Sequence, residues 1–192
     1  MIENEYKFIL LQDEYNNLLN EFDWQNKWSQ KNTYFETPEL SLCLQDITLR
    51  VRETPIQISV DTKIKKNNPD KISNLVSKLQ LKEIFKNYKD AVKYIQTGMP
   101  TLYEHTNISG NQLALQGFMY TERFEIQNEA YKIHLDHNVY LKQYDFELEI
   151  ELTNEIEFPK ELHQLTNNLS LRNVEVIGKR TRFFNTLTGR KL

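Results

Sequence analysis

The chain has 192 residues, of which 39% are hydrophobic and 27% charged, so it is long enough to form a globular domain with a substantial core. Its 24 basic and 27 acidic residues give a formal net charge of -3, which argues against a DNA-binding protein. One cysteine, Cys43, excludes an intramolecular disulfide and suits a reducing compartment. No apolar run is long enough to span a membrane and no leader-like segment opens the chain, so we expect a cytoplasmic protein without a membrane partner.

Alternating residues predict an opening strand over 2–11, followed by a helix from Asp13, as its N-cap, to about Phe22. Thr37-Pro38 should end the next strand, and Thr54-Pro55 should form the turn of a hairpin. The further strands of the first half are expected at 29–36, Ile47–Glu53 and Ile58–Ile64.

The middle of the chain changes periodicity. Ile72, Leu75, Val76 and Leu79 recur at helical spacing, and a second such stretch runs from Ile84 to Ile95, so we expect a helical insertion over about 70–105. Leu162, Leu165 and Leu169 then indicate a late helix, and a short segment around Phe183, Phe184 and Leu187 ends the chain. Strands are expected in between, at about 112–119, 120–127, 130–137 and 144–153.

No fixed-period repeat and no low-complexity linker divides the chain. Eight mostly antiparallel strands with helices inserted between them predict a single α+β domain over residues 1–192.

Charged side chains gather on one face of several of these strands. Side chains alternate between the faces of a strand, so Glu3, Glu5 and Lys7 share a face, as do Arg50 and Arg52. Each later strand repeats the pattern: Asp61 with Lys63, Arg123 with Glu125, Asp136 near a strand end, and Glu147 with Glu149 and Glu151.

For any one strand, the ordinary explanation is the wet face of an antiparallel sheet. Here, however, the opposite faces are rich in aromatic and branched residues, and amphipathic helices are available to cover them. If the helices pack outside, the sheet must curl around its charged face into a barrel or tunnel. Removing so many charges from water costs several kcal/mol for each ion, unless a polyanion with bound metal satisfies both signs.

The residue types suit that ligand. Arg50 and Arg52 offer forked donors to phosphate oxygens, while Lys7 and Lys63 supply point charges. Carboxylates are ligands for Mg²⁺ or Mn²⁺, and the candidates are Glu3, Glu5, Glu147 and Glu149.

These motifs resemble the CYTH family, also called triphosphate tunnel metalloenzymes, over nearly the whole chain. The family signature ExExK is matched at Glu3-x-Glu5-x-Lys7, and its LRxR segment at Leu49–Arg52. Further matches are Tyr34-Phe35-Glu36-Thr37, Lys63, Arg123-x-Glu125, Asp136, Phe146–Glu149, Lys179 and Arg182.

The resemblance implies an eight-stranded antiparallel β-barrel, the triphosphate tunnel, with helices packed outside and Mg²⁺ or Mn²⁺ at its acids. Lys65 could take the role of Lys63, because this strand is more polar than the family's usual threonine-leucine-lysine version. The catalytic residues would be Glu5, Lys7, Arg52 and Glu149. The substrate would be bound by Lys7, Arg50, Arg52, Lys63, Arg123, Lys179 and Arg182. The metal ligands would be Glu3, Glu5, Glu125, Asp136, Glu147 and Glu149.

The leading functional hypothesis is a metal-dependent triphosphatase acting on inorganic tripolyphosphate or on a nucleoside or thiamine triphosphate. The alternatives are a class IV-type adenylyl cyclase and a non-catalytic module that binds polyphosphate or nucleotides. Whether two protomers form a homodimer is left open. His105, His134, His137 and His163 lack the i,i+4 spacing of a helical zinc site, so we expect surface or hydrogen-bonding roles for them.

Overall fold

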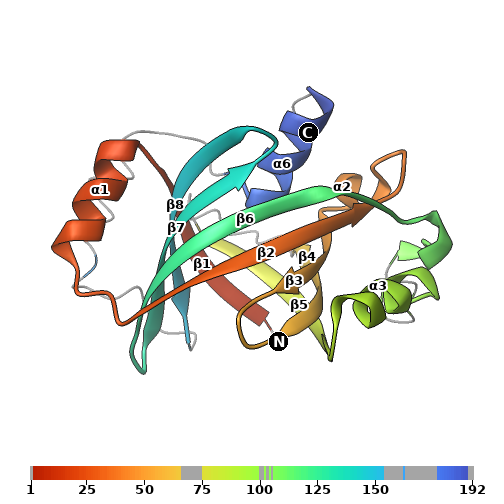
Figure 1. The fold of residues 1–192 in the computed structure, drawn as a ribbon, viewed down its shortest axis with the longest axis horizontal. Helices are drawn as coiled ribbons and strands as arrows, with labels where there is room; N and C mark the ends of the chain where they lie inside the picture. Colours follow the sequence, from red (N-terminus) through yellow and green to blue (C-terminus); the bar gives the residue numbers. More distant parts are fainter. Residues whose placement is uncertain are drawn as a thin grey trace.

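The computed structural model describes residues 2–65, 75–99, 102, 104, 106–153, 162 and 177–189, and at 2–4, 65 and 75–78 it describes the backbone alone. Eight antiparallel strands form a closed barrel in the order β1-β5-β4-β3-β2-β6-β7-β8, with β8 pairing back onto β1 (Figure 1). The strands are β1 (Ile2–Leu10), β2 (Asn26–Glu36), β3 (Ile47–Glu53), β4 (Ile58–Lys65), β5 (Leu75–Phe85), β6 (Ala114–Gln127), β7 (Tyr131–Tyr140) and β8 (Gln143–Leu152).

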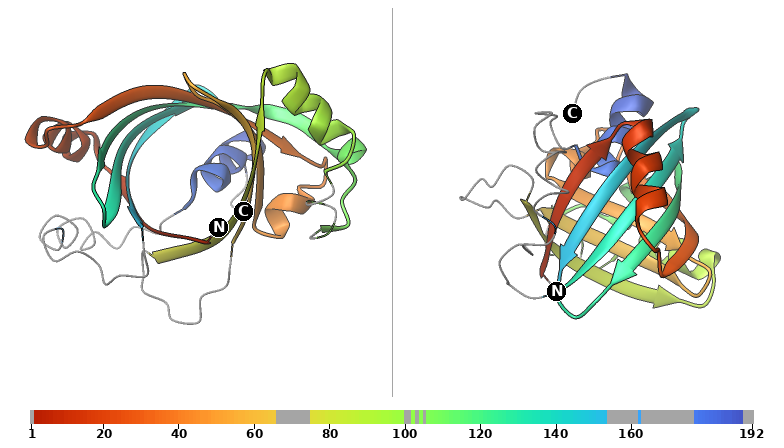
Figure 2. Two further views of the ribbon diagram at one scale, coloured as in Figure 1. Left: turned by 90° about the horizontal axis from the view of Figure 1, so that it is seen from below. Right: turned by 90° about the vertical axis from the view of Figure 1, so that its left-hand side faces the viewer.

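The outer face of the barrel is apolar and is covered by two helices, as the alternation predicts. Helix α1 (Gln12–Glu21) packs Tyr15 and Leu18 against Leu135, Leu148 and other residues of β7 and β8. Helix α3 (Tyr88–Gln96) covers β3 and β4 in a second core. Both helices lie outside the ring of strands (Figure 2, left).

The expected helix around Leu75 and Leu79 is wrong, because these residues belong to strand β5. Strand β5 pairs with both β1 and β4 and completes the ring, so strand pairing overrides the local helical spacing. The helix starts only at Tyr88, where the Asn87 side chain accepts a hydrogen bond from the Asp90 amide at 2.9 Å.

The segment expected to form two strands over 112–127 is one strand, β6, preceded by a 3₁₀ turn at Gly110–Gln112. The described residues therefore contain eight strands, as predicted. Two predicted strands are one, β6, and β5 is a strand where a helix was predicted. The helix expected around Leu165 and Leu169 lies outside the described residues.

Asp13 is not the N-cap of the first helix. Helix α1 begins at Gln12, and the Glu14 carboxylate accepts a hydrogen bond from the Leu11 amide at 2.6 Å. The acid three positions after the cap therefore satisfies this amide, and Asp13 lies in the first turn, where its charge suits the helix dipole.

Glu36 anchors the short helix α2 (Ser41–Leu44) after strand β2. Its buried carboxylate accepts hydrogen bonds from the amides of Thr37, Leu42 and Cys43 at 2.8 to 2.9 Å. The acid of the Tyr-Phe-Glu-Thr segment is thus a structural residue that fixes the chain reversal.

The last helix, α6 (Lys179–Thr188), does not pack outside with the others. It lies at one end of the barrel and within the outline of the ring (Figures 1 and 2). Its Phe183 and Phe184 are buried in an apolar cluster with Tyr34, Met119 and Tyr140. This cluster closes one end of the interior and fixes the basic residues of α6 beside the tunnel.

Candidate functional site: a charged tunnel

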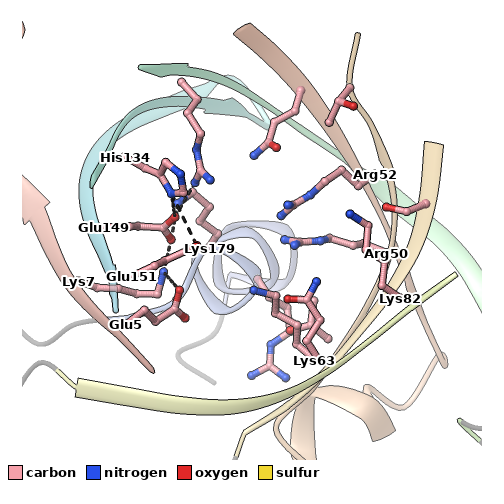
Figure 3. Close-up of a pocket in the computed structure, with 18 of the residues that line it drawn as sticks. Glu5, Lys7, Arg50, Arg52, Lys63, Lys82, His134, Glu149, Glu151 and Lys179 are labelled. Carbon is pink, nitrogen blue, oxygen red and sulfur yellow. Dashed lines mark hydrogen bonds and ion pairs between the residues drawn. The ribbon is translucent and has the colours of Figure 1, made fainter. Parts of the chain in front are cut away.

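The interior of the barrel contains a cavity of about 390 Å³ lined by charged side chains (Figure 3). Strand alternation directs these side chains inward, because the apolar residues between them face the helices outside. Eight strands give a barrel wide enough to hold one small ligand.

One side of the tunnel is acidic. We define the acidic wall as Glu5 of β1 with Glu147, Glu149 and Glu151 of β8. Glu5 and Glu149 are buried on the cavity surface, and Glu147 is fully buried behind it. Strands β1 and β8 are hydrogen-bonded neighbours, so carboxylates far apart in sequence become adjacent.

Lys7 lies among these acids. Its ammonium group is 3.2 Å from Glu5 and 3.1 Å from Glu147, and it also bonds Glu149. Burial by itself would lower the pKa of Lys7, but the charges of Glu149, Glu5 and Glu147 outweigh it and raise that pKa well above its ordinary value. Lys7 therefore stays protonated at neutral pH.

Three further cations pair with these acids and with Asp136. Arg123 of β6 donates to Asp136 at 2.6 Å and to Glu149 at 2.5 Å. Lys179 and Arg182 of α6 reach the same group: Lys179 lies 2.8 Å from Asp136, and Arg182 lies 2.5 Å from Glu147.

These ion pairs determine the charge state of the carboxylates. Burial would raise the pKa of Asp136, but Arg123 and Lys179 lower it to about 2. Burial likewise opposes ionisation of Glu149, yet Lys179, Lys7 and Arg123 hold its pKa well below the ordinary value. Both groups are therefore carboxylates at neutral pH.

The facing side of the tunnel is basic. We define the cationic wall as Arg50 and Arg52 of β3, Lys63 of β4 and Lys82 of β5, all of which line the cavity. In the ring of eight strands, β3 is four strands from β8 in either direction, so the two walls oppose each other (Figure 3).

The two arginines of the cationic wall lie close enough to repel each other. Burial first, and then the adjacent charge of Arg50, lower the pKa of Arg52 to about 10, although Asp61 acts against this shift. Arg52 remains protonated at neutral pH, but its charged form is less favourable here than in water. An anion in the tunnel would remove this penalty.

The donor set of the acidic wall fits a divalent cation. Its carboxylate oxygens are the ligands that Mg²⁺ and Mn²⁺ prefer. A second grouping includes a nitrogen: ligand atoms of His134, Glu149 and Glu151 all lie within 4.8 Å of one another.

The structure brings most of the predicted site residues together. Glu3 and Lys65 are the exceptions, because their side chains lie outside the described residues. Asp136, Glu147 and Arg182 are not on the cavity surface. Asp136 and Glu147 pair with Arg123 and Lys7, which line the cavity, and Arg182 pairs with Glu147. The predicted residues that line the cavity are Glu5, Lys7, Arg50, Arg52, Lys63, Arg123, Glu125, Glu149 and Lys179.

Several charged or titratable residues near the ligand space were absent from the predicted site, among them His134, Lys82, Glu151 and Asp61. His134 shares a strand face with Asp136, so alternation could have indicated it. Asp61 and Glu151 were placed on charged strand faces but were not assigned to the site. Lys82 lies in the segment wrongly predicted to be helical. The error in local structure therefore concealed part of the cationic wall.

The fold and the two walls define a charged-tunnel protein. A CYTH domain profile matches residues 1–183, and the chain belongs to the CYTH domain family. No helix in the described part of the chain is both long and apolar enough to cross a membrane.

The similar proteins are named either as triphosphatases or as adenylate cyclases. The chain is 27% identical over 187 residues to the Bacillus subtilis protein named "Putative triphosphatase YjbK", covering 95% of this chain and 94% of that one. A Bacillus halodurans crystal structure, described as a putative adenylate cyclase, is 25% identical with a TM-score of 0.68, covering 94% and 96% of the two chains. HpAC1 from Hippeastrum, whose description reports a dominant triphosphatase activity, shares the fold at 17% identity and a TM-score of 0.71, covering 99% and 97%.

Proposed function

We propose that this protein is a metal-dependent triphosphatase that hydrolyses a phosphoanhydride bond of inorganic tripolyphosphate or a related small triphosphate. The observation that carries the proposal is the separation of charge across one enclosed space, with the acidic wall on β1 and β8 and the cationic wall on β3, β4 and β5 (Figure 3). A chain of phosphates with a divalent cation on one side matches both walls at once.

Different residues of the chain would bind the phosphates and the metal ion. Arg50, Arg52, Lys63 and Lys82 would bind phosphate oxygens and align the phosphate chain along the tunnel. Glu5 and Glu149, which line the cavity, would hold Mg²⁺ or Mn²⁺, while Lys7 fixes them and the buried Glu147 through its ion pairs. When bound, the ion would neutralise phosphate charge and lower the pKa of an attacking water.

The overall reaction consumes one water. A P–O bond to a bridging oxygen breaks, so tripolyphosphate would yield orthophosphate and diphosphate. Phosphoryl transfer depends mainly on positioning and charge stabilisation, so no protein nucleophile is needed. The buried, cation-rich interior supplies both.

The test is a substrate panel. Purified protein with Mg²⁺ or Mn²⁺ is incubated separately with tripolyphosphate, ATP and thiamine triphosphate, and both phosphate and cyclic AMP are measured. We expect phosphate release without cyclic AMP. Cyclic AMP from ATP would instead establish the cyclase alternative, and binding without any turnover would establish the non-catalytic one.

A pair of variants links the activity to the tunnel. Glu5→Gln removes a buried charge from the acidic wall and should lower turnover by at least about 100-fold. Glu53→Gln is the matched control, because Glu53 pairs with Lys31 at 3.1 Å on the outside of the barrel. Equal activity of the two variants would contradict the proposal.

A further inference from the structure

His134 has an unusual position for a histidine in a barrel wall. It lies on β7, is 4% exposed and lines the tunnel. Its Nε2 atom is 2.9 Å from Glu125 Oε2, and its ring meets Trp28 edge-on at 6.4 Å. Glu125 is itself held by the Asn26 side chain at 3.2 Å. The ring orientation is therefore fixed from two sides.

The hydrogen bond to Glu125 defines the roles of the two ring nitrogens. An ionised carboxylate only accepts hydrogen bonds, so Nε2 must carry the proton that it donates. In the neutral ring Nδ1 then presents a lone pair. Nδ1 is buried, and it has no hydrogen-bond partner among the described residues. Burial of a polar atom without a hydrogen-bond partner is unfavourable, so this lone pair indicates a ligand.

The groups that face Nδ1 carry lone pairs as well. Glu151 Oε1 lies 3.6 Å away and Glu149 Oε2 lies 3.9 Å away (Figure 3). Arg123 bonds that Glu149 oxygen, which fixes the carboxylate and leaves a second lone pair available. Three electron-pair donors that converge on one point match a cation, because none of them can donate a hydrogen bond to another.

We propose that His134 Nδ1, Glu149 and Glu151 form a transition-metal site in the tunnel, with Glu125 as the carboxylate that orients the imidazole. A metal-bound histidine typically donates its other N–H to a carboxylate, which is the arrangement found here. Ligands about 2.1 Å from one ion lie roughly 3–3.5 Å apart, so the two distances from Nδ1 need to shorten by only a few tenths of an ångström. The proposal deepens the proposed function, because it concerns the metal that would serve the same tunnel.

The nitrogen ligand predicts which ions the site selects. Imidazole suits Zn²⁺ and other later first-row ions, whereas Mg²⁺ prefers oxygen ligands throughout. We therefore expect Zn²⁺ and Co²⁺ to bind through His134, and Mg²⁺ to bind without it. Glu151 is 28% exposed at its side chain, which leaves the site accessible from the tunnel.

Metal binding is measured on the full chain after removal of bound metal by a chelator, with no substrate present. Calorimetric titrations with Zn²⁺, Co²⁺ and Mg²⁺ compare the wild type with His134→Gln. The substitution should weaken Zn²⁺ and Co²⁺ binding at least about tenfold and Mg²⁺ binding by less than about threefold. His137→Gln is the matched control and should change neither, because His137 lies on the outer face of β7 and stacks on Phe146 at 5.0 Å.

A spectroscopic measurement keeps the proposal falsifiable if His134→Gln does not fold. In ¹⁵N-histidine-labelled wild type, Zn²⁺ should shift the Nδ1 resonance of one histidine. Unchanged histidine resonances, or an equal loss of Zn²⁺ and Mg²⁺ affinity in His134→Gln, would overturn the proposal. No triphosphate is present in these measurements, so they test metal binding separately from triphosphatase activity. A protein without activity could still bind Zn²⁺ through His134, and an active protein could lack this metal site.

Discussion

Arg52 and Asp61 form an incomplete ion pair across strands β3 and β4. Arg52 Nε lies 3.4 Å from Asp61 Oδ2, but that oxygen already accepts two hydrogen bonds from Arg50, at 3.2 and 3.1 Å. The hydrogen bond that Arg52 Nε donates goes instead to the neutral side chain of Asn32, at 3.1 Å. Two arginines thus share one carboxylate, and an anion bound in the tunnel would neutralise the remaining positive charge.

Because the two arginines share Asp61 unequally, we expect Arg52→Gln and Arg50→Gln to change the free energy of unfolding in opposite directions. Arg52→Gln should raise the KM for tripolyphosphate by roughly 10- to 100-fold, since a charge-assisted contact is lost. It should also raise the free energy of unfolding by on the order of 1 kcal/mol, because the lowered pKa of Arg52 marks a charge that the folded protein disfavours. Steady-state kinetics and urea unfolding measure the two effects.

Arg50→Gln is the matched comparison. It leaves buried Asp61 without two of its hydrogen bonds and should lower the free energy of unfolding by about 3 kcal/mol. If both arginine variants were destabilised equally, the unequal sharing of Asp61 would be wrong.

Tripolyphosphate should stabilise the protein even with chelator present, because the cationic wall binds phosphate without metal. A ligand at 100 times its Kd adds about 2.7 kcal/mol, which for a chain of this size raises Tm by roughly 5–10 °C. The increase should be smaller in Arg52→Gln. Thermal unfolding with increasing ligand measures it, and a Tm that does not respond to tripolyphosphate would contradict the role of this wall.

Asp61 should make stability depend on acid pH. Burial would raise its pKa, but Arg50 and Arg52 lower it from the ordinary 3.8 to about 2. A depressed carboxyl pKa stabilises the folded state fully above 3.8, and this contribution is lost as the pH falls towards 2. The free energy of unfolding of the wild type should therefore exceed that of Asp61→Asn by on the order of 2 kcal/mol at pH 7. At pH 3 this difference should be smaller by roughly 1 kcal/mol.

Urea unfolding of both proteins at the two pH values measures this difference. The exposed Asp23→Asn serves as a control that should track the wild type. A difference between wild type and Asp61→Asn that is constant from pH 7 to pH 3 would show that the charge of Asp61 does not cause it.

Gly117 lies under the last helix and should tolerate no side chain. A Cβ at this position would lie 2.9 Å from the Phe183 ring, and its backbone φ is +145°. Gly117→Ala should therefore lower the free energy of unfolding by about 1–3 kcal/mol. In a Phe183→Leu background the cost should fall by about 1 kcal/mol, leaving the backbone strain. Urea unfolding of the four proteins tests this, and an unchanged cost would exclude the contact as its cause.

Strand alternation carried much of the correct prediction. Glu5 with Lys7, Arg50 with Arg52, and Glu147 with Glu149 each share a face because a strand has a period of two. The same rule places apolar residues such as Leu148 and Ile150 outside, under α1. It failed at Leu75–Phe85, where local spacing suggested a helix and only pairing with β1 and β4 decides for a strand.

The amino-acid order alone determined which residues are charged, which of them share a strand face and which face is apolar, since these are local properties. Only the closed ring decided that β8 lies opposite β3, which turns scattered charges into two facing walls. It also brought His134 Nδ1 towards Glu149 and Glu151, and Lys179 towards Asp136. Such neighbours depend on strand order and helix docking, and these result from burial of apolar surface over the whole chain rather than from any local pattern.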